Sequence, residues 1–421
     1  MAILIARNFG DIGVSLGFAD WPAVADGPYS ALVALLFCGL PMVLWSFYVD
    51  KVHRRPSTGS DWSVKRPIAE VLDISIVKIA GIWATWTIIA AIYALCRLYW
   101  GGDYLFAMET LQLAVIPLIL LSVTYIVWLD RRLVNPRDGA WHFGAWVSGR
   151  SNWDQQEIFH HLRAWAVKGF FLAFMLSIIP GGFREIVNMD IAEVAGNPVL
   201  LAYAFITAMF VIDVQFATVG YMLTMRPLDA HIRTANPYLA GWVAALLCYP
   251  PFILMNNGGP LDYHIGTKDW AYWLADWPML MWVWGGVLVV LTGIYAWATV
   301  AFGLRFSNLT HRGILTHGPY ALSKHPAYLA KNIYWWLATL PFLVTTASTA
   351  DMIRNSALLA LVSAIYYWRA KTEEKHLKAD AVYAEYADWM ERYGVVPRLF
   401  AGLRGILAKG LRKCGDVQPA E

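Results

Sequence analysis

The sequence predicts an all-α, polytopic integral membrane protein with about nine transmembrane helices, its N-terminus outside and its C-terminus in the cytoplasm. Of the 421 residues, 58% are hydrophobic and only 15% are charged, whereas a typical soluble domain has about 25% charged residues. Long apolar runs alternate with polar loops, and every second loop is rich in Lys and Arg. These observations together favour helices that cross a membrane.

Apolar runs of about 18 residues or more can cross a bilayer core of roughly 30 Å. About nine runs meet or approach this length, of which the fourth and the ninth are short. In chain order they are Tyr29–Tyr48, Ile74–Cys96, Leu105–Trp128, Ala164–Ile179, Val199–Thr224, Leu239–Met255, Pro278–Phe302, Ala327–Thr346 and Ala357–Trp368.

Basic residues follow the first, third, fifth and seventh runs, and the positive-inside rule places such loops in the cytoplasm. The opposite loops are poor in base: Gly101–Tyr104 has no Lys or Arg, and Asn256–Trp277 has only Lys268. This alternation predicts an odd number of spans. The segment "WDQQEIFHHLRAW" in the second basic loop could form a short amphipathic helix on the inner surface. We expect the cytoplasmic (inner) membrane of a bacterium rather than the endoplasmic reticulum.

Metal and nucleic-acid chemistry are not indicated. The loop histidines His142, His160 and His161 lack a carboxylate at a chelating offset, so they read as surface residues. The four cysteines show no spacing typical of a metal site or a disulfide framework. We therefore expect no metal and no nucleic-acid partner, and the oligomeric state is left open.

Several ionisable or strongly polar residues fall inside the apolar runs, where they are costly unless they face a cavity or a partner. Lys78 and Lys168 are close enough to the cytoplasmic boundary to extend toward water. Glu109 and Asp213 are candidates for lining a substrate cavity, and pairing between helices is the alternative. The full set is Lys78, Glu109, Gln112, Lys168, Asp213 and Gln215.

The stretch "LSKHPAYLAKN" places charge where the eighth run begins. Pro326 suits the first turn of a helix, whose free N–H groups and positive dipole end then face the cytoplasm. Lys324 and His325 stand beside that end. They could form a site for a carboxylate or phosphate, or they could simply mark the membrane boundary and cap the helix.

The stretch "RAKTEEKHL" follows the ninth run. Arg369 and Glu373 are four residues apart and share one helix face just outside the membrane. The adjacent carboxylates Glu373 and Glu374 could hold a ribose hydroxyl, an ammonium or a sulfonium. A solvated helix with ordinary ion pairs is the alternative.

The combination of "GPYALSKHPAYL", "EEKHL", "YAEYADW" and "VVPRLF" resembles the isoprenylcysteine carboxyl methyltransferase family. That family belongs to a wider group of integral-membrane methyltransferases that includes phospholipid methyltransferases. The resemblance covers about Phe306–Phe400. It divides the chain into an N-terminal membrane region of about seven spans (1–303), a methyltransferase-like helix hairpin with a cytoplasmic extension (304–400), and a basic tail (401–421).

The resemblance implies S-adenosylmethionine as cofactor, bound on the cytoplasmic side between helices. Arg369 corresponds to an arginine that methyl-esterifying members use on the substrate carboxylate. Methyl transfer to a lipid-soluble or amphipathic acceptor follows, with a carboxylate slightly favoured, and it needs mainly positioning and desolvation. The implied cofactor-binding residues are Arg312, Gly313, Ile314, Leu315, Tyr320, His325, Pro326, Ala327, Tyr328 and Glu373, with Lys324, Asn332 and Glu374 as further candidates.

Departures from the family pattern leave the substrate open. Lys324 stands where Arg is usual, and Ala330 and Lys331 replace a Gly and an apolar residue. Two other functions remain. Sterol-type membrane reductases share a similar hairpin and use NADPH, but their tails carry an Arg-Asp stretch and a Cys where this chain has "TEEKHL". The second alternative is a non-enzymatic membrane protein that retains the hairpin.

Overall fold

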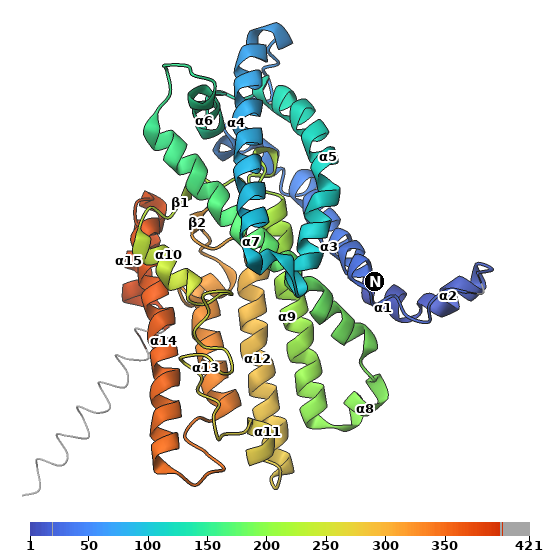
Figure 1. The fold of residues 1–421 in the computed structure, drawn as a ribbon. Helices are drawn as coiled ribbons and strands as arrows, with labels where there is room; N and C mark the ends of the chain where they lie inside the picture. The colour runs from blue at the N-terminus through green and yellow to red at the C-terminus, as the bar shows by residue number, and fades with distance from the viewer. Residues whose placement is uncertain (19, 396–397, 399–421) are drawn as a thin grey trace, which may run out of the picture.

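The protein is described here by a computed structural model that covers residues 1–18, 20–395 and 398. Long helices dominate it, and the only strands in that range form one short antiparallel pair (Figure 1). The helices are α1 (Ala2–Arg7), α2 (Phe9–Ser15), α3 (Pro28–Tyr48), α4 (Ile68–Leu95), α5 (Asp103–Asp130), α6 (Gly139–Val147), α7 (Gln155–Asn188), α8 (Ile191–Gly196), α9 (Pro198–Met222), α10 (Leu239–Leu246), α11 (Trp270–Trp273), α12 (Pro278–Phe302), α13 (Pro326–Thr339), α14 (Thr349–Leu377) and α15 (Ala381–Tyr393). The strands are β1 (Thr234–Ala235) and β2 (Thr310–His311).

Local sequence explains where several helices begin. Asp154 and Asn197 accept hydrogen bonds from the first free N–H groups of α7 and α9. Ser348 caps α14 and Asp380 caps α15 in the same way. Such side chains satisfy backbone donors that a helix cannot pair internally.

Six helices are long and apolar enough to cross a membrane among the described residues: α3, α4, α5, α7, α9 and α12. The fourth predicted run is longer than expected, because α7 has 34 residues and its first turns contain the predicted surface helix "WDQQEIFHHLRAW". The sixth predicted run is wrong as a single helix. α10 has 8 residues, and the chain turns near Pro250 and Pro251, since proline removes a backbone donor. α13 has only 14 residues.

The loops that we predicted on one side of the membrane do contact one another. Ser60 and Leu133 form an isolated β-bridge, and the Ser57 hydroxyl donates to Asp229 at 2.8 Å. β1 pairs with β2, which joins the loop after α9 to the loop after α12. These contacts join loops that the sequence places on one side, and the topology itself stays a prediction.

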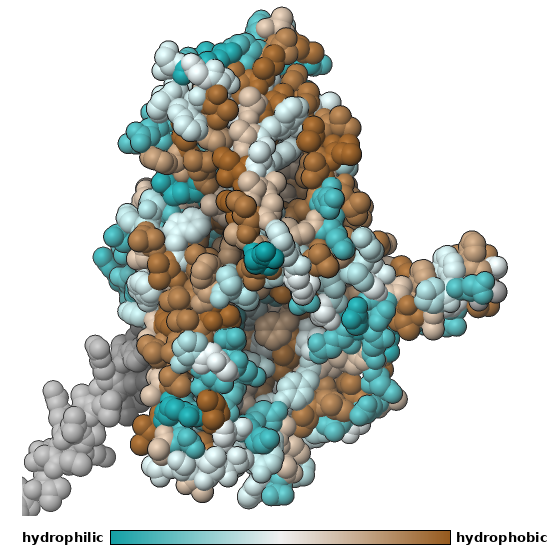
Figure 2. Space-filling model, in the orientation of Figure 1, coloured by the Kyte–Doolittle hydropathy of each residue, from teal (hydrophilic) through white to brown (hydrophobic). Residues whose placement is uncertain are grey.

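Apolar surface covers the helices expected to face lipid. Figure 2 shows large hydrophobic areas over α4 and α5, and α5 exposes Leu113, Ile116, Leu120 and Leu121. Such a surface is unusual for a soluble protein. It is the surface expected of helices that contact membrane lipid.

Three of the six polar residues inside the spans, Lys78, Lys168 and Asp213, have side-chain partners among the described residues. The Lys78 ammonium does not extend toward water: it is buried, 2.6 Å from Asp130 Oδ1 and 3.2 Å from Asp138 Oδ2. Glu109 is exposed and Asp213 is buried, so the two do not share one cavity. Asp213 accepts hydrogen bonds from the Tyr295 hydroxyl at 3.0 Å and from the Thr299 hydroxyl.

Candidate functional site

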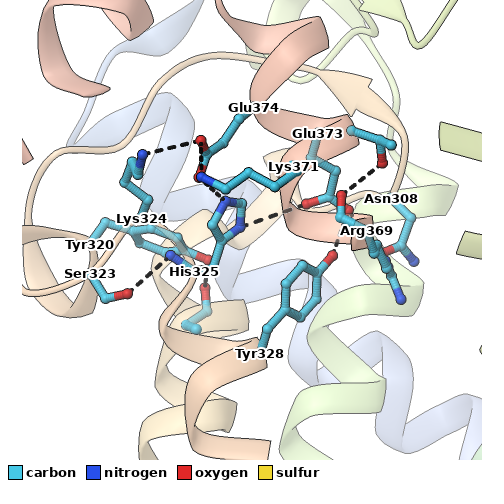
Figure 3. Close-up of polar contacts among 12 residues, drawn as sticks. Asn308, Tyr320, Ser323, Lys324, His325, Tyr328, Arg369, Lys371, Glu373 and Glu374 are labelled. Carbon is cyan, nitrogen blue, oxygen red and sulfur yellow. Dashed lines mark hydrogen bonds and ion pairs between the residues drawn. The ribbon is translucent and has the colours of Figure 1, made fainter. Parts of the chain in front are cut away.

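A cavity of about 160 Å³ lies where the end of α12, the start of α13 and the end of α14 meet the 303–325 loop and α15. Both sequence motifs contribute to its wall. Tyr320, His325 and Tyr328 come from the first motif, and Arg369 and Glu373 come from the second (Figure 3). The fold thus brings together two segments that lie more than 40 residues apart, as the 45-residue separation of Tyr328 and Glu373 shows.

Most of the predicted site residues surround this cavity. Two further candidates do not line it. Asn332 donates to the Tyr328 carbonyl within α13, and Glu374 turns toward Lys324 and His325. The predicted residues in the cavity wall are Arg312, Gly313, Ile314, Leu315, Tyr320, Lys324, His325, Pro326, Ala327, Tyr328, Arg369 and Glu373.

Glu373 is the only carboxylate in the cavity wall as described. Its Oε1 accepts a hydrogen bond from the Tyr328 hydroxyl at 2.5 Å and lies 3.3 Å from Arg369 Nε. Its Oε2 lies 3.9 Å from His325 Nδ1. These contacts hold the carboxylate in one orientation, with lone pairs left to accept hydrogen bonds from a ligand.

Arg369 is 2% exposed and is held from several sides. Its Nη2 donates to Asn308 Oδ1 at 2.6 Å, and its guanidinium lies 4.9 Å from the centre of the Tyr328 ring. The rings of Tyr249 and Tyr366 lie within 6 Å of the same group. Cation–π contacts and a single carboxylate partner offset part of the cost of burying this charge. The guanidinium is therefore a fixed positive charge at the cavity.

Lys324 and His325 do not form an open anion site at the start of α13. Their own chain supplies the anion, because Glu374 lies 3.1 Å from Lys324 Nζ and 3.2 Å from His325 Nε2 (Figure 3). Burial would raise the pKa of the Glu374 carboxyl, but the hydrogen bond and charge of His325 and the charge of Lys324 lower it to about 2. An ionised Glu374 thus ties the start of α13 to the end of α14.

Arg312 lines the cavity, but its guanidinium donates its hydrogen bonds to backbone carbonyls. It donates to the carbonyls of Ala230, at 2.7 Å from Nε, of Gly220, at 2.9 Å from Nη1, and of Phe306, at 2.6 Å from Nη1. These bonds hold the 303–325 loop against the end of α9. Its role in the predicted site is then to shape the wall, and the neighbouring Gly313–Leu315 backbone is left to face a ligand.

Sequence reasoning missed several residues of the cavity wall. Asn308 orients Arg369 and also donates to the Tyr221 hydroxyl at 2.9 Å. Tyr249 comes from the turn after α10, and Tyr383 comes from α15. The Tyr-rich segment "YAEYADW" was the one available signal. Neither Asn308 nor Tyr249 belongs to a motif, so only the fold reveals them.

The residues present fit S-adenosylmethionine. The Tyr383 hydroxyl is buried in the cavity wall without a hydrogen-bond partner among the described residues. Such a group is costly unless a ligand or water satisfies it. Together with Glu373 and the rings of Tyr320 and Tyr386, it gives the cavity polar and aromatic groups suited to a nucleoside with hydroxyl and ammonium groups.

Comparison with known proteins agrees with the predicted family. Residues 281–379 match the model of the isoprenylcysteine carboxyl methyltransferase (ICMT) family. No curated protein and no solved structure matches the chain. The matched segment begins in α12 and ends just after α14, so it starts earlier than the resemblance at Phe306 indicated. Six helices of the described residues are long and apolar enough to cross a membrane, which indicates a multi-pass membrane protein, and residues 281–379 are similar to the ICMT family.

Proposed function

We propose that the protein transfers a methyl group from S-adenosylmethionine to a lipid-soluble or amphipathic acceptor at the cytoplasmic face of the membrane. The observation that carries this proposal is the single cavity into which both family motifs project Tyr328, Arg369 and Glu373. The family match over 281–379 supports the reaction type.

Glu373, Tyr383 and the backbone of Gly313–Leu315 would hold the cofactor. When bound, the cofactor would supply a methyl group carried on a positively charged sulfur. The methyl group passes to the acceptor atom, and the electron pair of the broken bond stays on the sulfur. The chain's own residues have three tasks: to orient both reactants, to exclude water and to fix charge. No strong general base is needed if the acceptor arrives as an ionised carboxylate.

Arg369 is suited to orient such a carboxylate. A guanidinium stays charged at every physiological pH and can make two parallel hydrogen bonds to a carboxylate. Asn308 and Glu373 fix its plane at 2.6 Å and 3.3 Å. An acceptor carboxylate bound beside it remains ionised and therefore nucleophilic.

The test measures binding of S-adenosylmethionine and of NADPH to the purified protein in detergent. We expect the wild type to bind the methyl donor, and Glu373→Gln or His325→Ala to weaken that binding at least about tenfold, since a charged hydrogen-bond partner contributes about 1.5–3 kcal/mol. The matched control is Glu385→Gln, an exposed carboxylate on α15 outside the cavity, which should bind as the wild type does.

Three results would contradict the proposal. Binding of NADPH alone would favour the sterol-type reductase. Binding of neither compound would favour a non-enzymatic protein. Donor binding that is unchanged in Glu373→Gln would show that the cofactor lies elsewhere.

A further inference from the structure

The cavity wall carries far more positive than negative charge. Its residues include five cationic side chains, Arg305, Arg312, Lys324, Lys331 and Arg369, and one carboxylate, Glu373. S-adenosylmethionine itself has a net positive charge, from its sulfonium and ammonium groups against one carboxylate. A cationic donor in a basic cavity leaves a charge imbalance that the second reactant can correct.

Lys331 differs from the other cations. Arg312 is bonded to backbone carbonyls, Lys324 pairs with Glu374 at 3.1 Å, and Arg369 lies 3.3 Å from Glu373. The Lys331 ammonium has no hydrogen bond and no carboxylate oxygen within 4.0 Å among the described residues. The Lys331 side chain is half-buried. An ammonium has three hydrogen-bond donors and no acceptor, so one that lacks a direct anionic contact can bind the anion of a ligand.

An aromatic cage surrounds this ammonium. The ring centres of Trp335, Tyr295 and Tyr366 lie 5.1, 5.4 and 5.7 Å from Lys331 Nζ. Asp213 makes no direct ion pair with it within 4.0 Å, and its charge acts on the ammonium only from farther away. Its oxygens accept hydrogen bonds from the hydroxyls of Tyr295 and Thr299. The aspartate instead holds the Tyr295 ring in place. The cage orients the charge and offsets part of its desolvation, but supplies no hydrogen-bond acceptor.

Lys331 also lies deeper in the membrane region than the predicted cofactor segments. It follows Tyr328 by three residues on α13, so the two share a helix face. The Gly313–Leu315 segment, Tyr383 and Tyr386 lie instead in the loop and α15, away from the spans. The ammonium thus lies nearer to the spans than the predicted cofactor segments do.

We propose that Lys331 binds a negatively charged headgroup, carboxylate or phosphate, of an amphiphilic acceptor. This inference rests on the proposed methyl transfer and narrows the class of acceptor to an anionic amphiphile. Lys331 would select this acceptor over a neutral amphiphile. Lys331 is a specificity-determining residue that acts beside Arg369.

The test compares three probes with the same alkyl chain, dodecanoate, dodecyl phosphate and dodecanol. Binding of each radiolabelled probe to the full-length protein in lipid nanodiscs is measured by equilibrium dialysis against empty nanodiscs. We expect the wild type to bind at least one anion about tenfold or more tightly than the alcohol. Lys331→Met should lose this difference, and Lys331→Arg should keep it.

Two controls separate the outcomes. Lys331→Gln keeps hydrogen-bond donors in the cage without the charge, and it should lose the preference for anions even if Lys331→Met folds poorly. Binding of S-adenosylmethionine should stay within about twofold of the wild type in both variants. An unchanged anion preference would overturn the proposal.

A loss of donor binding with anion preference retained would also overturn it, because Lys331 would then hold the carboxylate of the donor. The preference for one anion over the other tells a carboxylate headgroup from a phosphate. The anion measurement is made without the methyl donor. A failure to bind S-adenosylmethionine would therefore refute the proposed function, while the anion preference of the wild type and the Lys331 variants would still decide whether Lys331 binds the anion.

Discussion

Buried charges in the cavity wall and beside it depend on partners that lie far away in the sequence. Arg369 takes its orientation from Asn308, which is 61 residues earlier, and Glu374 pairs with His325, which is 49 residues earlier. The sequence predicted that Arg369 and Glu373 share a helix face, since an interval of four is a local property. It did not predict Asn308, because the approach of two distant segments depends on the whole fold.

His376 gives the folded state a dependence on pH. It lies in the last turn of α14, with Nε2 2.9 Å from the Thr234 hydroxyl oxygen. Burial, then the positive charges of His311 and Arg163, lower the pKa of His376 from 6.5 to about 4. Between those pH values the unfolded imidazole binds a proton and the folded one does not. Stability therefore falls as the pH drops from about 6.5 toward 4.

We expect the loss of stability to reach the order of 2 kcal/mol at pH 5, because one pKa unit corresponds to about 1.4 kcal/mol. Thermal unfolding in detergent at pH 7.5, 6.5 and 5 measures it. His376→Gln should reduce the fall in melting temperature across this range, and His231, whose pKa burial and nearby arginines lower to about 3, should retain part of it. His317→Gln, at an exposed position, serves as the control. If both variants keep the wild-type pH profile, His376 is not responsible.

At the scale of secondary structure, the ends of helices were harder to predict than their existence. Five of the six apolar helices extend past the runs read from the sequence at one or both ends, and α7 begins nine residues before Ala164. Apolarity marks only the part of a helix that lies in hydrocarbon, whereas capping residues such as Asp154 decide where it begins. α10 was overestimated for the opposite reason, because an apolar segment need not be helical.

The contact between α4 and α6 rests on two glycines. A Cβ atom added at Gly144 would lie 1.9 Å from the Val77 carbonyl oxygen, and one added at Gly81 would lie 2.1 Å from the Ala140 carbonyl oxygen. The two backbones touch, as in tightly packed membrane helices. The sequence did not indicate this contact, since α6 falls in a segment read as a polar loop.

We therefore expect Gly144→Ala to destabilise the protein by more than about 2 kcal/mol. The added methyl group would meet a backbone carbonyl, which cannot move aside as a flexible side chain can. The melting temperature and the yield of monodisperse protein measure the effect. Gly286→Ala in α12 is the matched control: nothing lies within 4 Å of its added Cβ. Alanine is a better helix former than glycine by about 1 kcal/mol, so the control should be neutral or stabilising. Equal behaviour of the two variants would refute the close contact.

For the whole molecule, the match to a family covers only 281–379, yet the cavity uses residues outside it. Tyr249 comes from the turn after α10, and Tyr383 and Tyr386 come from α15. The two motifs predicted the hairpin because their spacing and charges are local signals. The contribution of Tyr249 could not be predicted, because nothing in the sequence around it resembles the family.

Arg312 is the clearest link between the two parts. Its buried guanidinium joins the Phe306 carbonyl, in the loop before α13, to the carbonyls of Gly220 and Ala230, which belong to the N-terminal region. Removing it leaves three carbonyls without their donor, and each buried unsatisfied group costs about 1–3 kcal/mol. Arg312→Met should therefore lower the melting temperature by several degrees and lose binding of S-adenosylmethionine together, unlike the cavity variant Glu373→Gln, which should lose binding alone.

Arg312→Lys tests whether charge or geometry matters. Lysine keeps the positive charge but lacks the planar fork that reaches carbonyls of two segments at once, so it should fail almost as badly as methionine. Arg392→Met, at an exposed position on α15, controls for the loss of an arginine and should leave stability and binding unchanged. If Arg312→Met unfolds at the wild-type temperature and still binds the donor, the N-terminal helices do not hold the cavity together, and the hairpin must form the site alone.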